Sequence, residues 1–470
     1  MMFDESGTTN GWPAANGQPT RRSFLSGLGA TVGLGALTGS GRAQPTAAPD
    51  GSGAVYYVAR IGDGALPGRK RGWSNNGNGN GNQNGNRNGA GNGNGSATDA
   101  ERGRGHGRLA DAEYLVLEGD TGTIAFATDG TAEEAFQHAF DELPASGGTV
   151  VASGDTFEFG GPATVGDDTG LVGSGGTRFV VAGASGESGH DLIRVRGDGA
   201  TVANIEFDAD GTQTDNHAIQ ADDCDGLVIA NNRTVEGFQM AISFSRCRNV
   251  QVVGNEVLDP NWYGITSRAA PTGGDRDLRR SENVVVARNY VAGVTYNNIA
   301  TYNVSNFTVY GNVVEEGGHS LIACSPAQQG AIVGNVCRGL EEYKPDPGGE
   351  AGIEIEYKET HVREEIAGTD RARSYDITIS GNQVDNCPVG ILARTVPADP
   401  EDEAARETER PHSFTVTGNS INGADAAGIR IRSGAAGVVA TNTVRDSPTP
   451  LEVDETYATD IEQGLNATRA

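Results

Sequence analysis

The sequence predicts an all-β protein in which the chain winds as a parallel β-helix, with one coil for each repeat. The first observation is an asparagine that follows a short apolar run again and again, at spacings of 23 residues or longer. This asparagine occurs as Asn232, Asn255, Asn289, Asn312, Asn335, Asn382, Asn419 and Asn442. Repeats of about 20 to 50 residues are typical of solenoids and arrays.

The second observation is an isoleucine that lies 13 residues before the asparagine. It occurs as Ile219, Ile242, Ile299, Ile322 and Ile429, and Ile265, Ile353 and Ile391 hold the same place ahead of an insertion. The apolar runs have the length of strands, alternate between inward and outward residues, and are rich in Val and Ile. One repeat is too short for two helices. We therefore expect about ten or eleven strand-built coils, stacked roughly 4.8 Å apart.

A single helix is expected at the N-terminal end of the solenoid. Thr131 and Glu134 have the spacing of a capping box. The apolar face of the helix comprises Ala135, Phe136, Ala139, Phe140 and Leu143. Because the first coil of a solenoid exposes strand edges and core, this helix would cap it.

The two ends of the chain differ from the repeats. Residues 1–43 resemble a twin-arginine export signal, in which Arg21 and Arg22 precede a mildly apolar stretch. Residues 44–110 are assigned to a disordered linker rich in Gly and Asn, which cannot bury apolar area. The β-helix domain is expected over 111–460 and a flexible tail over 461–470. This organisation predicts an extracellular or cell-surface protein exported by the twin-arginine machinery.

The repeats resemble the right-handed β-helix family with the pectin-lyase-like fold. The resemblance covers roughly residues 112–455 and depends on the Gly-Asn repeats, on Gly147-Gly148-Thr149 and on Leu171-Val172-Gly173. It implies that the sheet containing the isoleucines carries a substrate groove on its outer face. One scaffold hosts many activities, so the reaction has to be argued from the residues of the site.

The amino-acid composition limits which classes of molecule the protein can bind. The chain has 62 acidic and 35 basic residues, a formal charge of −27, and only three lysines, Lys70, Lys344 and Lys358. An acidic surface that prefers arginine resembles those of proteins from extreme halophiles. Such a surface repels nucleic acid and anionic membranes. The apolar stretch of the export signal is too short and too rich in glycine to span a membrane stably, and no other segment is apolar enough.

Three insertions mark one side of the isoleucine strand as the functional one. They fall just after this strand, around residues 268–280, 358–372 and 395–411, and a further one around 339–350 falls before it. Long loops in a compact solenoid usually carry function. Alternation along the strand directs a set of polar and aromatic residues outward, and the candidate substrate-binding residues among them are Trp262, Arg268, Tyr296 and Lys358.

The candidate catalytic residues lie on the same face. Glu354 and Glu356 alternate on one strand, so they stand about 6.5–7 Å apart. Two close carboxylates raise the pKa of one of them, as an acid catalyst requires. Arg394 has the register of Glu356 on the next coil, and it would either bind substrate or neutralise the glutamate. His319 and Tyr302 would serve a β-elimination, in which one removes the proton next to a uronate carboxyl.

The expected function is processing of an acidic polysaccharide, as a lyase or an epimerase. Two alternatives stay open: a glycoside hydrolase that uses Glu354 and Glu356, and a surface module that binds carbohydrate without turnover. No metal site is assigned, and calcium is the one cofactor kept under consideration. The repeated asparagines are expected to form a structural ladder. Cys224 and Cys247 stack on adjacent coils, as a disulfide or as two thiols.

Overall fold

The computed structural model describes residues 53–61, 112–182, 190–211, 214–268, 279–340, 351–358, 369–370, 372–397 and 409–469. All of them belong to one compact unit, Ala48–Ala470. The twin-arginine segment, the Gly/Asn-rich tract and the central parts of the four insertions lie outside the described residues.

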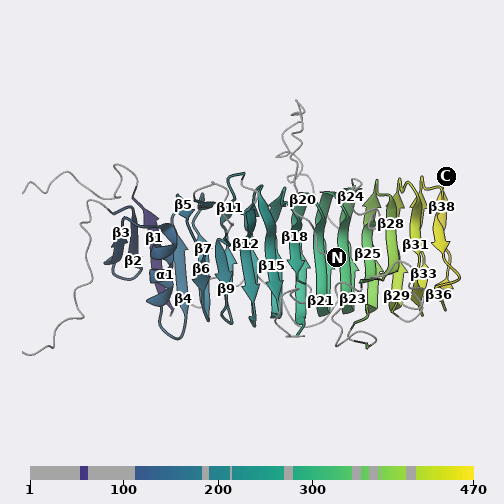
Figure 1. The fold of residues 1–470 in the computed structure, drawn as a ribbon, viewed down its shortest axis with the longest axis horizontal. Helices are drawn as coiled ribbons and strands as arrows, with labels where there is room; N and C mark the ends of the chain where they lie inside the picture. Colours follow the sequence, from purple (N-terminus) through teal and green to yellow (C-terminus); the bar gives the residue numbers. More distant parts are fainter. Residues whose placement is uncertain are drawn as a thin grey trace, which may run out of the picture. The chain divides into compact units, whose positions relative to one another are not determined.

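The coils consist of three stacks of parallel strands. In Figure 1 the strands of successive coils lie side by side in sequence order. We call the first stack the isoleucine face; it comprises β6 (Ala163–Val165), β9 (Ile193–Val195), β12 (Thr214–Asp222), β15 (Phe238–Ser245), β18 (Tyr263–Ser267), β21 (Asn297–Tyr310), β23 (Ser320–Val333), β25 (Ala351–Lys358), β28 (Val389–Val396), β31 (Ala427–Ile431) and β35 (Leu451–Val453). Strands β21 and β23 are long enough to continue around the corner into the second stack.

The second stack, the asparagine face, contains the runs that precede the repeated asparagine. It comprises β4 (Gly148–Ala152), β7 (Thr169–Gly173), β10 (Thr201–Ala203), β13 (Val228–Ala230), β16 (Arg248–Val253), β19 (Ser281–Ala287), the second halves of β21 and β23, β26 (Tyr375–Ser380), β29 (His412–Thr417), β33 (Val438–Ala440) and β37 (Glu462–Gln463). The short strands β32 (Gly434–Ala435) and β36 (Ala458–Thr459) extend this sheet near its end.

The third stack is a separate sheet of twelve strands within the described residues. It comprises β5 (Thr156–Phe159), β8 (Arg178–Val181), β11 (Glu206–Asp208), β14 (Arg233–Thr234), β17 (Glu256–Leu258), β20 (Tyr290–Val294), β22 (Val313–Gly317), β24 (Val336–Leu340), β27 (Gln383–Asp385), β30 (Ser420–Asn422), β34 (Thr443–Arg445) and β38 (Ala467–Arg469). The parallel solenoid is therefore confirmed, and it has slightly more coils than the asparagine spacing predicts.

The predicted register of the isoleucine face is confirmed strand by strand. Ile219 pairs with Ile242, Ile242 with Ile265, and the row continues without a shift to Ile429. Every isoleucine in the row is at most 1% exposed. Because side chains alternate along a strand, the two residues that flank each isoleucine point away from the core.

The asparagine ladder is also confirmed. The Asn255 side chain accepts a hydrogen bond from the backbone N–H of Asn232 at 2.9 Å, and its own amide donates to Asn289 at 3.0 Å. The same amide donates to the Ile229 carbonyl. Gly254, which precedes this asparagine, has φ +69°, a left-handed conformation that glycine adopts without strain and that explains the Gly-Asn pattern.

The N-terminal cap contains more than the expected helix. Helix α1 (Ala132–Asp141) buries Ala135, Phe136 and Ala139, as the sequence predicts. Thr131 is the N-cap residue but makes no side-chain cap bond, so the capping box is not formed. β2 (Tyr114–Glu118) and β3 (Ile124–Thr128) pair antiparallel beside the helix.

Two boundaries require correction. β1 (Ala54–Arg60), inside the stretch assigned to a linker, pairs with β2 and β4. Its sequence Ala-Val-Tyr-Tyr-Val-Ala-Arg is rich in aromatic and β-branched residues, which favour strands, and it covers the edge of the first coil. The expected tail at 461–470 instead contains β37 and β38, and Asn466 extends the asparagine ladder by one coil.

The five cysteines are buried and none forms a disulfide. Cys224 and Cys247 are the pair for which the sequence left a disulfide open. The pKa of the Cys224 thiol is raised by its hydrogen bond with Cys247 and by burial. The pair is therefore two stacked thiols.

Candidate functional site

The centre of the isoleucine face carries charged side chains directed away from the core. Ile353 and Ile355 of β25 belong to the core, so alternation directs Glu354 and Glu356 to the other side of the sheet. Glu356 pairs in register with Arg394 of β28, as the sequence predicts. This register brings side chains of neighbouring coils together on the outer side of the sheet.

Arg394 forms ion pairs with both glutamates. Its Nε donates to Oε1 of Glu354, and its Nη2 lies 3.6 Å from Oε2 of Glu356. The exposed fractions are 0% for Glu354, 1% for Glu356 and 5% for Arg394. Buried charges of this kind remain ionised only when each has a partner. The alternative in which Arg394 neutralises the glutamates is therefore the one that the structure contains.

The pKa of Glu354 shifts down, whereas an acid catalyst requires a rise. Burial acts to raise this pKa and is the largest single influence. The positive charge of Arg394, the electrostatic interaction with the His319 ring and the Ser320 hydrogen bond lower it and prevail. Glu354 is consequently a carboxylate at neutral pH. It can attract a cation or accept a proton, but it is a poor proton donor.

His319 and Tyr302 lie close to Glu354 through two intervening polar residues. The Ser320 hydroxyl donates to Oε2 of Glu354 at 2.5 Å and lies 3.4 Å from Nδ1 of His319. The Ser320 backbone N–H donates to Asn297, whose side-chain amide donates to the Tyr302 hydroxyl at 2.6 Å. This chain of hydrogen bonds links all the candidate catalytic residues except Glu356, which Arg394 contacts directly.

The Tyr302 phenol stays protonated. Burial raises its pKa well above the usual 10.0, and the nearby Tyr263 and Glu356 raise it further. A neutral phenol cannot act as a phenolate base near neutral pH, but it can donate a proton. His319 is therefore the better base of the two.

An aromatic row leads from the surface to these polar groups. The Tyr296 ring stacks on Trp262 at 5.3 Å and lies 4.3 Å from the His319 ring. Trp262 is 41% exposed, whereas Tyr296 is 6% and His319 is 2% exposed. Nζ of Lys358 lies 3.2 Å from the Tyr296 hydroxyl. The predicted substrate-binding residues Trp262, Tyr296 and Lys358 are thus adjacent to the glutamates.

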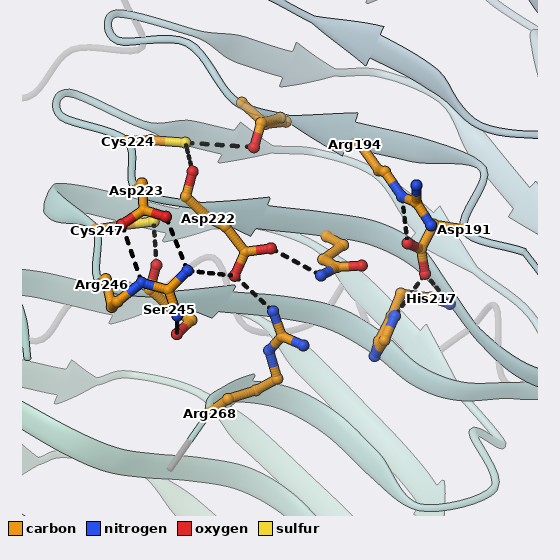
Figure 2. A network of polar contacts seen from close by, with 12 residues as sticks. Asp191, Arg194, His217, Asp222, Asp223, Cys224, Ser245, Arg246, Cys247 and Arg268 are labelled. Carbon is orange, nitrogen blue, oxygen red and sulfur yellow. Dashed lines mark hydrogen bonds and ion pairs between the residues drawn. The ribbon is translucent and has the colours of Figure 1, made fainter. Parts of the chain in front are cut away.

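Arg268 is the predicted residue that contacts a different group. Its Nη2 donates to Oδ1 of Asp222 at 2.5 Å. Figure 2 shows Asp222 and Asp223 facing the guanidinium groups of Arg246 and Arg268. The carboxylates of this aspartate pair are therefore neutralised by arginines.

A second pair in Figure 2 consists of Asp191 and His217. Nδ1 of His217 lies 2.6 Å from Oδ1 of Asp191, and Nε of Arg194 lies 2.8 Å from the other carboxylate oxygen. Asp191 also accepts the His217 backbone N–H, so it fastens two neighbouring coils. The pKa of Asp191 is lowered because these partners outweigh its burial. This geometry gives His217 a structural role.

Comparison with known families now decides the fold type. The family described as "Right handed beta helix region" matches residues 191–359, the part of the chain that contains most of the polar cluster. The protein is a right-handed parallel β-helix. No curated protein matches it by sequence.

Solved structures with the same fold share little sequence with this β-helix. The surface protein and adhesin PfbA of Streptococcus pneumoniae has 14% identity and a TM-score of 0.53, with 72% of this chain and 96% of that chain covered. An exopolygalacturonase of Thermotoga maritima has 12% identity and a TM-score of 0.52, with 71% and 87% covered. The catalytic unit of a GH87 alpha-1,3-glucanase of Streptomyces thermodiastaticus has 12% identity and a TM-score of 0.50, with 73% and 67% covered.

The described residues of the β-helix contain neither a cluster of metal-binding side chains nor a helix suited to a bilayer. No group of three or more His, Cys, Asp or Glu side chains there could hold a metal ion. In the same residues, no helix has the length and apolarity needed to cross a bilayer. Calcium remains an expectation from the sequence.

Three residues of the cluster were missed by the sequence analysis. Ser320 and Asn297 connect Glu354 to Tyr302, and the Tyr263 ring packs edge-on against Tyr302 at 6.0 Å. Ser320 and Asn297 are adjacent in register, each two residues before its isoleucine. A search for polar residues at that one position would have found both.

Proposed function

We propose that the β-helix processes an acidic polysaccharide by removing the proton next to a sugar carboxylate, as a lyase or an epimerase. The observation that carries the proposal is the continuous row from the exposed Trp262 through Tyr296 to His319 and the buried carboxylates. Aromatic faces bind the apolar faces of sugars, and the polar groups at the inner end supply acid–base chemistry.

The roles follow from the electrostatics of the cluster. His319 takes the proton, and the ionised Glu354 stabilises the imidazolium that results. The electron pair moves into the sugar carboxylate, and Arg394 and Lys358 are the nearby cations that can offset its negative charge. Binding in this mode requires Arg394 to share its guanidinium between the glutamates and the substrate.

The second half of the reaction distinguishes the two activities. In a lyase the electron pair expels the glycosidic oxygen from the neighbouring carbon. That oxygen takes a proton from the Tyr302 hydroxyl, and the proton held by His319 restores the phenol. A carbon–carbon double bond is left in the product. In an epimerase no bond to oxygen breaks, and a proton returns to the opposite face of the same carbon.

The two polysaccharide enzymes among the similar folds support the substrate class, since their scaffold carries polysaccharide-directed activity. The hydrolase alternative is weaker, because the lowered pKa of Glu354 does not suit it to the role of general acid. A hydrolase remains consistent with the lowered pKa of Glu354 only if Glu354 is the nucleophile and Glu356 is the general acid.

A binding module without turnover is the second candidate. It is favoured by the ion pairs that Arg394 makes with Glu354 and Glu356, because these groups satisfy one another in the absence of substrate. In that case Trp262 and Tyr296 would supply the sugar contact by themselves.

The test is mass spectrometry of products from a panel of acidic polysaccharides, incubated with the mature protein in molar salt. Products with an unsaturated end establish the lyase, hydrated fragments establish the hydrolase, and hydrogen exchange from solvent deuterium without cleavage establishes the epimerase. His319→Ala should abolish the product, whereas His412→Ala, a histidine on β29 stacked on Tyr375, should retain it. Sugar binding without any product would favour the module.

We also propose that residues 1–43 direct export by the twin-arginine route. The proposal depends on the paired Arg21 and Arg22 ahead of the apolar stretch. Replacing both arginines with lysine keeps the charge and should leave the precursor inside the cell. Export at the normal level by this variant would contradict the proposal.

A further inference from the structure

A hollow lined by arginines lies at the corner between the isoleucine face and the asparagine face. Its volume is about 410 Å³. Its lining comprises Arg246, Arg248, Arg279, Arg280, Glu282, Ser305 and Gln328. None of these residues belongs to the cluster around Glu354.

Strand pairing gives the floor of the hollow a regular geometry. Arg248 of β16 pairs with Glu282 of β19, which pairs with Ser305 of β21, which pairs with Gln328 of β23. Four neighbouring strands thus contribute one residue each to a single row. With a strand spacing of about 4.8 Å, this row is roughly 14 Å long, enough for more than one sugar unit.

The charge of the hollow is opposite to that of the protein. Four arginines and one glutamate line it, in a chain whose formal charge is −27. Among the described residues, and including Arg268 and the two aspartates of Figure 2, five guanidinium groups face three carboxylates, a sum of +2 for these side chains. A small positive hollow on a negative surface concentrates anions where the surrounding surface repels them.

Asp223 holds two of the guanidinium groups in place. Its Oδ1 accepts from Nε of Arg246 at 2.9 Å and from Nη2 of Arg279 at 2.7 Å. The Arg279 side chain remains 63% exposed and the Arg248 side chain 61%. Nε of Arg248 lies 3.8 Å from Glu282, beyond hydrogen-bonding distance. Arg248 can therefore turn its guanidinium group toward a ligand, and Arg279 is exposed at the position where Asp223 holds it.

The position relative to the proposed active site indicates what kind of anion fits. Ser305 follows Tyr302 by three residues on β21, and Gln328 follows Ser325 by three residues on β23. Three residues of strand span about 10 Å. A chain of sugars bound at Tyr302 can thus reach the hollow within about two sugar units.

We infer that this hollow is an anion-binding subsite that takes a carboxylate or sulfate group of an acidic polysaccharide. Guanidinium groups match planar and tetrahedral oxyanions with two parallel hydrogen bonds, which suits either group. The inference deepens the proposed function and depends on it for the polymeric nature of the ligand. Anion binding itself is a separate property that requires no turnover.

Binding is tested by titration calorimetry with a galacturonate hexamer, inorganic sulfate and neutral cellohexaose. The variant Arg248→Gln/Arg279→Gln removes the two exposed guanidinium groups. The control Arg288→Gln/Arg445→Gln removes the same charge from exposed positions outside the hollow. We expect the hollow variant to bind the hexamer about tenfold more weakly and the control within about twofold of the parent. Thermal unfolding of each variant verifies that it folds.

The outcomes separate the two proposals. If the hexamer binds the hollow variant as tightly as the parent, or cellohexaose binds the parent as tightly as the hexamer, the subsite is contradicted. If sulfate binds the parent as tightly as the hexamer does, the hollow recognises a single anion, and the inference that it is a subsite for a polymer is contradicted. If His319→Ala binds the hexamer in the hollow but forms no product, the subsite stands regardless of the reaction. If the parent forms no product but binds the hexamer more tightly than the hollow variant does, only the proposed function is contradicted.

Discussion

Glu354 and Arg394 illustrate how single residues acquire their properties from the stacking of coils. They are separated by 40 residues in the chain, yet the pairing of β25 with β28 places them in contact and without solvent exposure. Their charges are tolerated because each has a partner. The same contact that stabilises the fold sets the protonation state of the carboxylate.

The first prediction concerns the free energy of unfolding. Glu354→Gln leaves Arg394 with the more distant Glu356 and should destabilise the protein by about 3 to 5 kcal/mol, the usual cost of removing one partner of a buried pair. The matched control is Glu452→Gln, which removes an exposed ion pair with Arg430 and should cost under about 1 kcal/mol. Urea denaturation measures both. If both variants lost the same free energy of unfolding, the buried ion pair would contribute no more to stability than the exposed one.

The second prediction concerns pH. The folded-state pKa of Glu354 lies below its ordinary value of 4.5, so folding favours its ionised form. The resulting stabilisation is fully present above pH 4.5 and is lost as the pH falls through the lower folded-state pKa. Urea denaturation at a series of pH values from above 4.5 to well below it should therefore show a steeper fall for the parent than for Glu354→Gln. Parallel curves would contradict the direction of the shift.

Among the elements, the corners between strands determine which residues meet. The asparagines from Asn232 to Asn466 fix one corner of successive coils, since each side chain bonds both the backbone and the amide of its neighbours. Among the described residues, the corner with the arginine hollow shows no such ladder of buried amides, and the insertions after β18, β25 and β28 are accommodated there. Each of these coils thus has one corner that the asparagine ladder fixes and one corner that accommodates insertions.

The third prediction tests the rigid corner. Asn312→Ala removes the acceptor for the Asn289 backbone and side chain and the donor to Val286 and Asn335. Four buried groups lose a partner, so we expect a loss of more than about 3 kcal/mol in urea denaturation. Gln383→Ala, which removes one exposed hydrogen bond to Asp385, should cost under about 1 kcal/mol. A small effect at Asn312 would mean that the neighbouring coils rearrange to replace its bonds.

For the whole molecule, the charge of −27 makes stability depend on salt. Repulsion among exposed carboxylates opposes the compact state, and salt screens it. We expect the urea midpoint to rise between about 0.1 M and about 2 M KCl, as the Debye length shortens from about 10 Å to under about 3 Å. Sucrose at matched water activity is the control, since it does not screen charge. A midpoint that is insensitive to KCl would contradict an electrostatic origin.

Periodicity was the most informative feature of the sequence at this scale. The row from Ile219 to Ile429 and the asparagine ladder could be assigned before the structure, because both repeat with one residue type at one register position. β1 and the last coil were missed for the opposite reason. Ala54–Arg60 does not belong to a repeat. Asn466 follows Glu462-Gln463-Gly464-Leu465, a run that lacks the apolar alternation found before the other asparagines.

The sequence by itself determined the coil, its register, and therefore which residues share the outer side of the isoleucine face. Strand alternation and one fixed repeat are local properties, so they can be read along the chain. Only the tertiary structure decided that Glu354 is buried and ionised, that Arg268 belongs with Asp222, and that four arginines line one hollow. Those properties depend on side chains from different coils and on the exclusion of water between them, and neither is encoded in the spacing of residues.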